Sequence, residues 1–353
     1  MKYTRYITGL VVLLAMGCSR MAQPKVGSVP IVCRAVTRDV AGEQTKGAGV
    51  TNMTALRSSG IGIFAWETED GMPFNGVNPY LQNSEFSYDN GLELWKGGVY
   101  WPIDHWLSFF AYSPYSANVS SGALRFPSSD YVSGYPRLQF TPEPLAANQV
   151  DLCLATPVMD RSASVSDGVV PLTFSHVLTR LCIQARWTGT SAQIAQVASV
   201  GQTIRVLSMR ICNVVGSNKL TYGPTSFLWD SPSAGEYDDS YTMSIANGTF
   251  RDVALPAAGT YSTNFWNISD ACMYLLPQSL LAGSELIVSY GIFNSDGTQF
   301  LEESASFDIG NLQQNIWPAG MMMTYSVTID LTEHYAIEAE ISYEGNAGCF
   351  VTL

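Results

Sequence analysis

Residues 323–331 read Met-Thr-Tyr-Ser-Val-Thr-Ile-Asp-Leu, and this stretch decides the fold class. Large apolar side chains alternate with small polar ones along it. This period of two is the pattern of a β-strand with one face in a core and the other face in water. The alternation recurs at residues 181–187 and 286–292, which predicts further strands of the same kind.

Turn signals separate the apolar runs. Asn-Gly and Asp-Gly pairs tolerate the positive φ angles of tight hairpins, and six such pairs begin at Asp70, Asn75, Asn90, Asp167, Asn247 and Asp296. Two of them join strand-like runs, residues 241–245 with 250–255 and residues 286–293 with 299–307. Helical patterns are short, at residues 51–58 and 191–200. Strand after strand without interleaved helices predicts an all-β fold of antiparallel β-sandwiches.

Composition and length limit the class of protein. The 353 residues include 18 Lys and Arg against 30 Asp and Glu, which gives a net charge of −12. Without clustered basic residues, the chain is not expected to bind nucleic acid. The length predicts two domains, and a polar stretch at residues 160–168 divides two strand-rich parts. We therefore expect one sandwich at residues 28–165 and a second at residues 166–353.

The N-terminus has the pattern of an export signal. Two basic residues precede an apolar run at residues 7–16, which is too short to span a bilayer as a helix. The run ends in Ala15-Met16-Gly17-Cys18, which resembles a bacterial lipobox. This resemblance implies a signal peptide at residues 1–17, a lipid such as palmitate on Cys18, and a linker at residues 18–27. An ordinary secretory signal is the alternative, and both imply export. The only membrane tether expected is the lipid anchor.

Residues for catalysis or metal binding do not form recognisable motifs. None of the three histidines has a second His or a Cys at ligand spacing, and no His-Glu-x-x-His or Gly-x-Ser-x-Gly sequence occurs. We therefore expect no cofactor, no metal site and no enzyme activity. Six cysteines follow Cys18, far apart and mostly within apolar runs, which favours buried free thiols. Export also permits disulfides, whose pairing the sequence leaves open. These cysteines are Cys33, Cys153, Cys182, Cys212, Cys272 and Cys349.

Five blocks of sequence, in order along the chain, resemble the fimbrillin family of pilins from Bacteroidales. The most specific is Trp95-Lys-Gly-Gly-Val-Tyr-Trp-Pro102, followed by Leu107-Ser-Phe-Phe-Ala-Tyr-Ser-Pro114. The others are Ser59-Gly-Ile-Gly-Ile-Phe-Ala-Trp66, Asp151-Leu-Cys-Leu-Ala155 with Leu172-Thr-Phe-Ser-His176, Met273-Tyr-Leu-Leu-Pro-Gln278, and Trp317-Pro-Ala-Gly320 before the strand at residues 323–331. None of these blocks is a catalytic motif, and His176 is interpreted as a structural residue of its strand.

The resemblance implies a fold and a mode of assembly. Such pilins consist of two transthyretin-like antiparallel β-sandwiches in tandem and travel to the outer membrane as lipoproteins. A trypsin-like protease then cuts after an Arg near the start of the first domain and removes its first strand. An extended terminal segment of another subunit fills the groove, which is a form of β-augmentation.

The first strand is expected at about residues 29–38, with Ile31, Cys33 and Ala35 on one face. Arg38 is the first candidate for the cleaved residue, because a protease cuts a loop more readily than the interior of a strand. Arg34 is the second candidate, since Asp39 is an unfavourable neighbour for a trypsin-like protease at Arg38.

The segment at residues 335–353 contains the candidate donor strand. Apolar and polar residues alternate in it, with Ile337, Ala339, Ile341 and Tyr343 as the donor positions. The same alternation also suits the last strand of the chain's own second sandwich.

The resulting hypothesis is a structural or adhesive subunit of a cell-surface fimbria. Its expected partners are other fimbrial subunits, a trypsin-like processing protease, and host or bacterial surface ligands. The alternative is an outer-membrane lipoprotein that binds glycans by stacking sugars on rings in the region 95–106, although such rings often fill a sandwich core instead. An exported hydrolase is a third possibility, for which the motifs are missing. The rings concerned are Trp95, Tyr100, Trp101 and Trp106.

Overall fold

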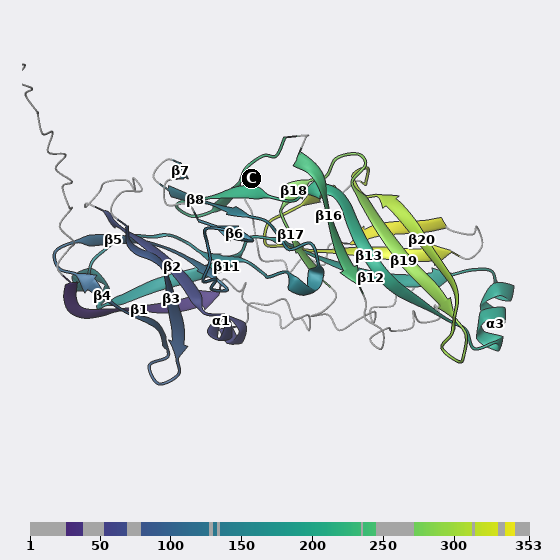
Figure 1. Ribbon diagram of the computed structural model, residues 1–353, viewed down its shortest axis with the longest axis horizontal. Helices are drawn as coiled ribbons and strands as arrows, with labels where there is room; N and C mark the ends of the chain where they lie inside the picture. Colours follow the sequence, from purple (N-terminus) through teal and green to yellow (C-terminus); the bar gives the residue numbers. More distant parts are fainter. Residues whose placement is uncertain are drawn as a thin grey trace, which may run out of the picture.

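The structure is a computed structural model. It describes residues 26–37, 53–68, 79–126, 130–132, 135–233, 236–244, 272–312, 315–330 and 336–342. The prediction of an all-β fold is confirmed, since strands make up most of the described elements. Figure 1 shows β1 to β5 gathered on one side of the molecule and β12, β13, β16, β19 and β20 on the other. None of the helices within the described residues has the length and apolarity that a membrane crossing requires.

The first half forms a sheet that closes on itself. Its strands follow the order β5-β2-β3-β4-β1-β11-β9, and β9 also pairs with the end of β5, which closes the sheet. β10 pairs with the beginning of β5. Twenty buried residues, among them Trp95 and Phe109, form the core inside this sheet. The strands are β1 (Val26–Thr37), β2 (Ile61–Thr68), β3 (Pro79–Asp89), β4 (Leu94–Pro102), β5 (Trp106–Ser113), β9 (Cys153–Ala155), β10 (Val158–Arg161) and β11 (Val169–His176).

A small sheet joins the two parts of the chain. In it β14 (Asn218–Tyr222) lies between β15 (Phe227–Trp229) and β8 (Tyr135–Phe140), and β8 also pairs with β6 (Leu124–Arg125) and β7 (Tyr131–Val132). An aromatic cluster fills the space between this sheet and the barrel-like one. The rings of Phe64 and Phe126 stack with their centroids 3.9 Å apart.

The second half forms two four-stranded sheets over one core. One sheet has the order β17-β12-β22-β23 and the other β16-β13-β19-β20. The strands are β12 (Thr179–Thr188), β13 (Thr203–Val215), β16 (Tyr237–Ser244), β17 (Cys272–Leu275), β19 (Glu285–Phe293), β20 (Gln299–Asp308), β22 (Met322–Asp330) and β23 (Ala336–Ser342), with a further short pair of β18 (Gln278–Ser279) and β21 (Ile316–Trp317).

The stretch at residues 323–331 has the buried strand face that its alternation predicts. Met323, Tyr325 and Val327 in β22 are fully buried. The indole N–H of Trp317 donates a hydrogen bond of 2.8 Å to the Tyr325 hydroxyl, which satisfies the polar end of a buried ring.

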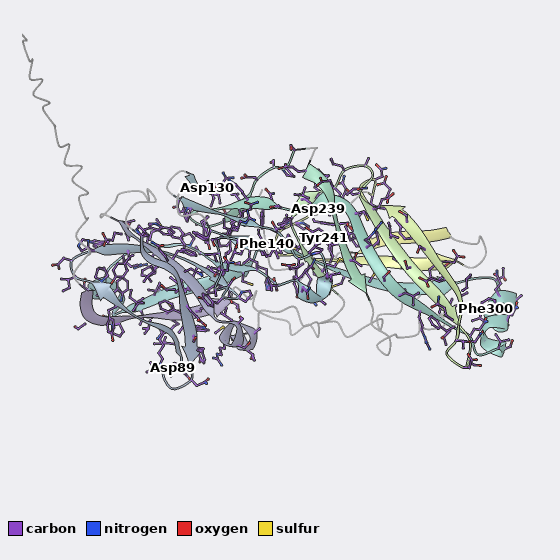
Figure 2. The ribbon with its side chains drawn as sticks, in the orientation of Figure 1. Asp89, Asp130, Phe140, Asp239, Tyr241 and Phe300 are labelled. Carbon is purple, nitrogen blue, oxygen red and sulfur yellow. A yellow bond between two sulfur atoms is a disulfide. The ribbon has the colours of Figure 1, made fainter. Side chains whose placement is uncertain are left out.

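Turns and helices also follow the sequence signals. The Asp296-Gly297 turn joins β19 to β20 with Gly297 at φ +82°, and the Asn90-Gly91 turn joins β3 to β4. Figure 2 places Asp89 at the tip of that second hairpin, and exposed Phe300 at the opposite end of the molecule. The predicted hairpin around Asn247 lies outside the described residues. Helices α1 (Met53–Ser59) and α3 (Ser191–Ser199) confirm the two helical patterns, and two single turns add to them, η1 (Ala146–Asn148) and α2 (Ala163–Ser166).

The prediction of purely antiparallel sheets is wrong for two strand pairs. β1 runs parallel to β11, and β12 runs parallel to β22. In both cases the partners are far apart in the sequence, which is what a parallel pair requires. The pairing also places β11, which follows the expected boundary at residue 165, in the same sheet as β1. The strands change sheets after His176.

The cysteines are not all free thiols. Cys182 in β12 and Cys272 in β17 lie directly opposite each other with 4.5 Å between their Cα atoms, and they form a disulfide. The interpretation as free thiols is therefore wrong for this pair. Cys33, Cys153 and Cys212 are buried and do not belong to a disulfide.

Candidate functional site

Strand β1 is an inner strand of the barrel-like sheet. It pairs antiparallel with β4 on one side and parallel with β11 on the other. The parallel register runs from Val32 opposite Val169 to Thr37 opposite Phe174. Just before it, the Val32 N–H donates a 3.1 Å hydrogen bond to the carbonyl oxygen of Gly168. β1 therefore fills a slot between two other strands.

Alternate side chains of β1 belong to the core. Ile31, Cys33 and Ala35 are each no more than 2% exposed, which confirms that they share one face. Burial raises the pKa of the Cys33 thiol far above its ordinary value. On the other face, Val36 and the Arg34 side chain are exposed. The strand thus contributes a full row of side chains to the interior.

The side of β4 that faces β1 is irregular. Val32 lies opposite Lys96, but Pro30 lies opposite Tyr100, so three residues of β4 occupy the space of one. Such a bulge needs unusual backbone angles, and Gly98 supplies one at φ +69°. Gly97 has the Phe86 ring 2.7 Å from the place of a Cβ atom, which leaves no space there for a side chain.

The two cleavage candidates lie at the C-terminal end of β1. Arg34 is inside the strand, opposite Pro171 of β11. Arg38 follows directly after the strand and lies outside the described residues. Cys18, the expected lipid site, also lies outside them.

The candidate donor segment includes strand β23. It pairs antiparallel with β22, from Thr324 opposite Ser342 to Asp330 opposite Ala336, and forms the edge of its sheet. The backbone positions of Ile337, Ala339 and Ile341 lie in this strand, and Tyr343 lies outside the described residues. In the single chain the segment is therefore the last strand of its own sheet, which is the second of the two roles that its alternation allows.

The aromatic residues of the region 95–106 mainly fill the core. Trp95 and Trp101 are each 1% exposed, while Tyr100 is 45% exposed and Trp106 is half-buried. The hypothesis that Trp95 and Trp101 stack on sugars is wrong, because a sugar cannot reach a ring that other side chains cover.

Comparison with known proteins identifies the family. Residues 50–343, well over half of the chain, match the family described as Fimbrillin-like. The chain belongs to this fimbrillin-like family. Fimbrium subunit Fim1C of Phocaeicola vulgatus is 24% identical to it, over 95% of this chain and 94% of the relative. The crystal structure of a fimbrial protein from Bacteroides vulgatus ATCC 8482 has the same fold with a TM-score of 0.61 and 18% identity, covering 90% of this chain and 99% of that one.

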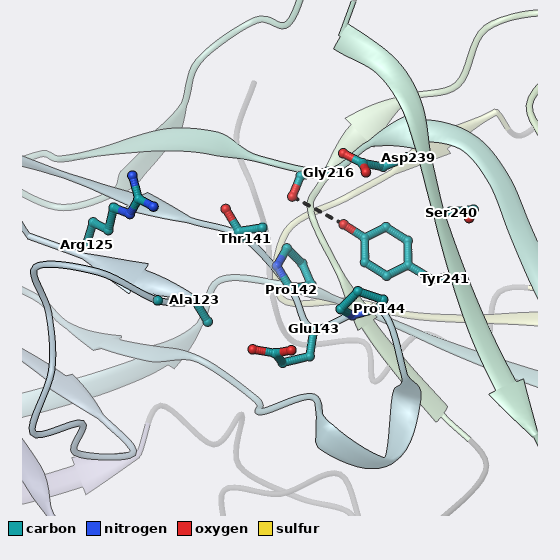
Figure 3. A pocket seen from close by; sticks show the side chains of 11 residues that line it. Ala123, Arg125, Thr141, Pro142, Glu143, Pro144, Gly216, Asp239, Ser240 and Tyr241 are labelled. Atoms are coloured by element: carbon teal, nitrogen blue, oxygen red, sulfur yellow. Dashed lines mark hydrogen bonds between the residues drawn. The ribbon is translucent and has the colours of Figure 1, made fainter.

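The fimbrillin-like chain also has a small hollow where the joining sheet meets β16. Figure 3 shows Thr141, Pro144 and Tyr241 around it, with the Tyr241 hydroxyl donating a 3.2 Å hydrogen bond to the carbonyl oxygen of Gly216. Burial, and then the charge of Asp239, raises the pKa of Tyr241 far above its ordinary value. The hollow has a volume of about 220 Å³, below the roughly 300 Å³ at which ligand pockets begin.

A polar cluster that the sequence did not reveal lies between β9 and β11 of the fimbrillin-like chain. His176 Nδ1 lies 3.0 Å from Oδ1 and 2.9 Å from Oδ2 of Asp151, and 3.6 Å from Sγ of Cys153. Burial by itself lowers the pKa of His176, but Asp151 and then Cys153 outweigh that effect and raise the pKa to about 11. The only signal in the sequence is the spacing of Asp151 and Cys153. The pairing of His176 with Cys153 appears only in the register of the sheet.

This cluster is not arranged like the catalytic triad of a hydrolase. In a triad, one nitrogen of the imidazole takes the proton of the nucleophile, and the carboxylate binds the opposite nitrogen, orients the ring and stabilises its charged form. Here Asp151 and Cys153 both approach Nδ1. The geometry therefore lacks the opposite placement of nucleophile and carboxylate that a triad requires, in agreement with a family of structural fimbrial proteins.

Proposed function

We propose that this chain is a structural or adhesive subunit of a cell-surface fimbria that polymerises by protease-triggered donor-strand exchange. The observation that carries the proposal is the place of β1, a strand near the N-terminus that pairs on both sides and buries one face. The relative named as a fimbrium subunit supports the fimbrial role.

Loss of β1 would leave a slot that a neighbour's strand can fill. It would leave the main-chain groups of β4 and β11 that face β1 unpaired. It would also open the part of the core that the side chains of Ile31, Cys33 and Ala35 fill. Each main-chain group left unsatisfied costs about 1–3 kcal/mol, and replacing Ile31 with water in the core costs roughly 1.5–3 kcal/mol more. A strand that restores both kinds of contact would bind strongly, and this difference in free energy would drive assembly.

Strand β23 is the candidate donor. As an edge strand it has strand pairing on one side, to β22. Its release therefore costs fewer hydrogen bonds than the release of an inner strand. In the slot of a second subunit, main-chain hydrogen bonds would then give affinity and alternate side chains would set the register. These side chains are those of Ile337, Ala339, Ile341 and Tyr343.

Cleavage after Arg38 fits this scheme better than cleavage after Arg34. Arg38 follows the strand, whereas the main chain at Arg34 lies within the ladder formed with β11. A protease must draw its substrate into an extended form in its own site, so a residue already held in a sheet is protected.

The proposal includes the route to the surface and the organisation of the chain. Export as a lipoprotein on Cys18 would bring the precursor to the outer membrane before it joins a surface fimbria with other subunits. The tandem transthyretin-like organisation belongs to the proposal too, and the pairing of β11 with β1 favours a division after His176 over one at residue 165. Binding of glycans without polymerisation is less favoured, because Trp95 and Trp101 are buried.

Limited digestion of the purified precursor with trypsin tests the scheme. We expect a new N-terminus at Asp39, followed by a ladder of polymers on gels of unboiled samples. Arg38→Ala should abolish both, and the matched variant Arg34→Ala should keep both. A product that begins at Asp39 and remains monomeric would disprove strand exchange at this slot.

A further inference from the structure

The cluster of Asp151, Cys153 and His176 brings three different metal-ligand types to one point. A carboxylate oxygen, a thiol sulfur and an imidazole nitrogen all lie within 4.8 Å of one another. A single Nδ1 proton cannot form a linear hydrogen bond to both neighbours at once. In agreement, Oδ2 of Asp151 is buried and has no hydrogen-bond partner of good geometry, although it lies 2.9 Å from Nδ1. A cation at the centre would satisfy all three atoms together.

The distances suit tetrahedral coordination. From ordinary Zn–N, Zn–O and Zn–S bond lengths, neighbouring ligand atoms should lie roughly 3.3 Å apart for N and O and roughly 3.6 Å apart for N and S. The observed separations are 3.0 Å between Nδ1 and Oδ1 and 3.6 Å between Nδ1 and Sγ. The third pair, the Asp151 carboxylate and Sγ of Cys153, lies within 4.8 Å, so small shifts of these side chains toward a central cation would be needed to reach tetrahedral spacing.

The surroundings combine a closed side with an entry path. The Asp151 side chain is 10% exposed and Cys153 is buried, so both donors are held within the protein. The His176 side chain is 35% exposed, which gives a cation and a water molecule access from solvent. On binding, the cation takes the place of the Nδ1 proton, and the Cys153 thiol releases its proton to solvent. The resulting thiolate and the Asp151 carboxylate together balance the charge of a divalent cation. The donor set of one sulfur, one nitrogen and one oxygen favours the zinc class over calcium or magnesium.

We propose that Asp151, Cys153 and His176 form a binding site for a divalent transition-metal cation of the zinc class, with water as the fourth ligand. This site goes beyond the fimbrial role and does not depend on strand exchange. A bound cation would hold two strands together at the point where the chain leaves the barrel-like sheet. It joins β9 to the last residue of β11, directly before the chain passes through Val177 and Leu178 into β12.

Cobalt binding to the exported chain tests the site. After treatment with a chelator, the chain is titrated with Co²⁺, which absorbs strongly when it is bound to a thiolate in tetrahedral geometry. We expect one Co²⁺ per chain, a sulfur-to-cobalt absorption band, and displacement of the cobalt by Zn²⁺. Cys153→Ser should remove the band while leaving the Asp151 and His176 pair in place. Asp151→Asn should weaken binding at least tenfold, in line with the loss of a ligand.

Cys212→Ser is the matched control, because Cys212 is also buried and outside any disulfide but lies in β13. It should keep the band unchanged. Thermal melting of each variant without metal establishes that it is folded, and Zn²⁺ should raise the melting temperature of the unchanged chain but not that of Cys153→Ser. Absence of Co²⁺ uptake by the unchanged chain, or a band that persists in folded Cys153→Ser, would overturn the proposal.

Discussion

Trp101 in β4 donates its indole N–H to the carbonyl oxygen of Gly168 at 3.2 Å, although strand β1 lies between β4 and β11, which begins directly after Gly168. The same carbonyl accepts the N–H of Val32 in β1. Gly168 is therefore a point where both walls of the slot and the strand that fills it meet. The bond from Trp101 joins the two walls directly, so we expect it to keep them together if β1 leaves the slot.

Replacement of Gly168 with alanine should lower the stability of the chain more than an ordinary glycine replacement does, because it disturbs the packing of β1 in its slot. Gly168 has φ +78°, and a Cβ atom there would lie 3.0 Å from Val29 and 3.1 Å from the Pro30 carbonyl oxygen. Gly98 is the matched control, since it has φ +69° with nothing within 4 Å of the same position. Backbone strain of about 1 kcal/mol applies to both variants, and the contact with β1 applies to Gly168→Ala alone. Urea denaturation should show the larger loss of stability for Gly168→Ala, and equal losses would contradict this role.

The thiol of Cys33 should report whether β1 is in its slot. In the intact chain Cys33 is fully buried with a raised pKa, so it should react with iodoacetamide far more slowly than an exposed cysteine. Cleavage after Arg38 and release of the strand would expose it on the free peptide. Mass spectrometry of the alkylated peptides would measure this change. Cys212 serves as the control that stays protected in both states, and rapid labelling of Cys33 in the uncleaved chain would contradict the buried position.

Local patterns predict those parts of the fold that depend on local chemistry. The alternation in β22 and in β1 identifies the buried faces, because side chains of a strand point to opposite sides in turn. The Asp296-Gly297 pair marks the hairpin between β19 and β20 for a similar reason, since its backbone angles suit few other residues. The Trp95 and Trp101 rings were expected to fill a core or to stack on sugars, and their surroundings in the folded chain decide for the core.

Long-range pairing is what the sequence does not reveal. Nothing near β1 indicates that its second neighbour is β11, and the disulfide of Cys182 joins it to a partner 90 residues away. The same holds for the cluster at His176, whose members meet through the register of β9 and β11. These contacts depend on which strands pair and in which register, and a period of two fits many registers equally well.

The contribution of β1 to the core can be measured with one pair of variants. Ile31→Ala should lower the free energy of unfolding by about 2–4 kcal/mol, because it leaves a cavity among fully buried neighbours. Val29→Ala, in the same strand but 40% exposed, should cost less than about 1 kcal/mol. Urea denaturation of the uncleaved variants would measure both losses. Similar small losses for the two variants would mean that β1 contributes little to the interior, and the cost of an empty slot would then be too small to drive assembly.

The disulfide between Cys182 and Cys272 should stabilise the second half of the chain. It fastens β12 to β17 and closes a sequence separation of 90 residues, which limits the freedom of the unfolded chain. The chain-entropy relation gives an upper value of about 4–5 kcal/mol for a loop of that length. The double variant Cys182→Ala with Cys272→Ala should therefore melt at a lower temperature, and dithiothreitol should lower the melting temperature of the unchanged chain but not that of the variant. Polymer formation after trypsin treatment should be retained below the new melting temperature, because the disulfide lies outside the slot of β1. Loss of polymers from a folded double variant would show instead that this pair of strands takes part in exchange.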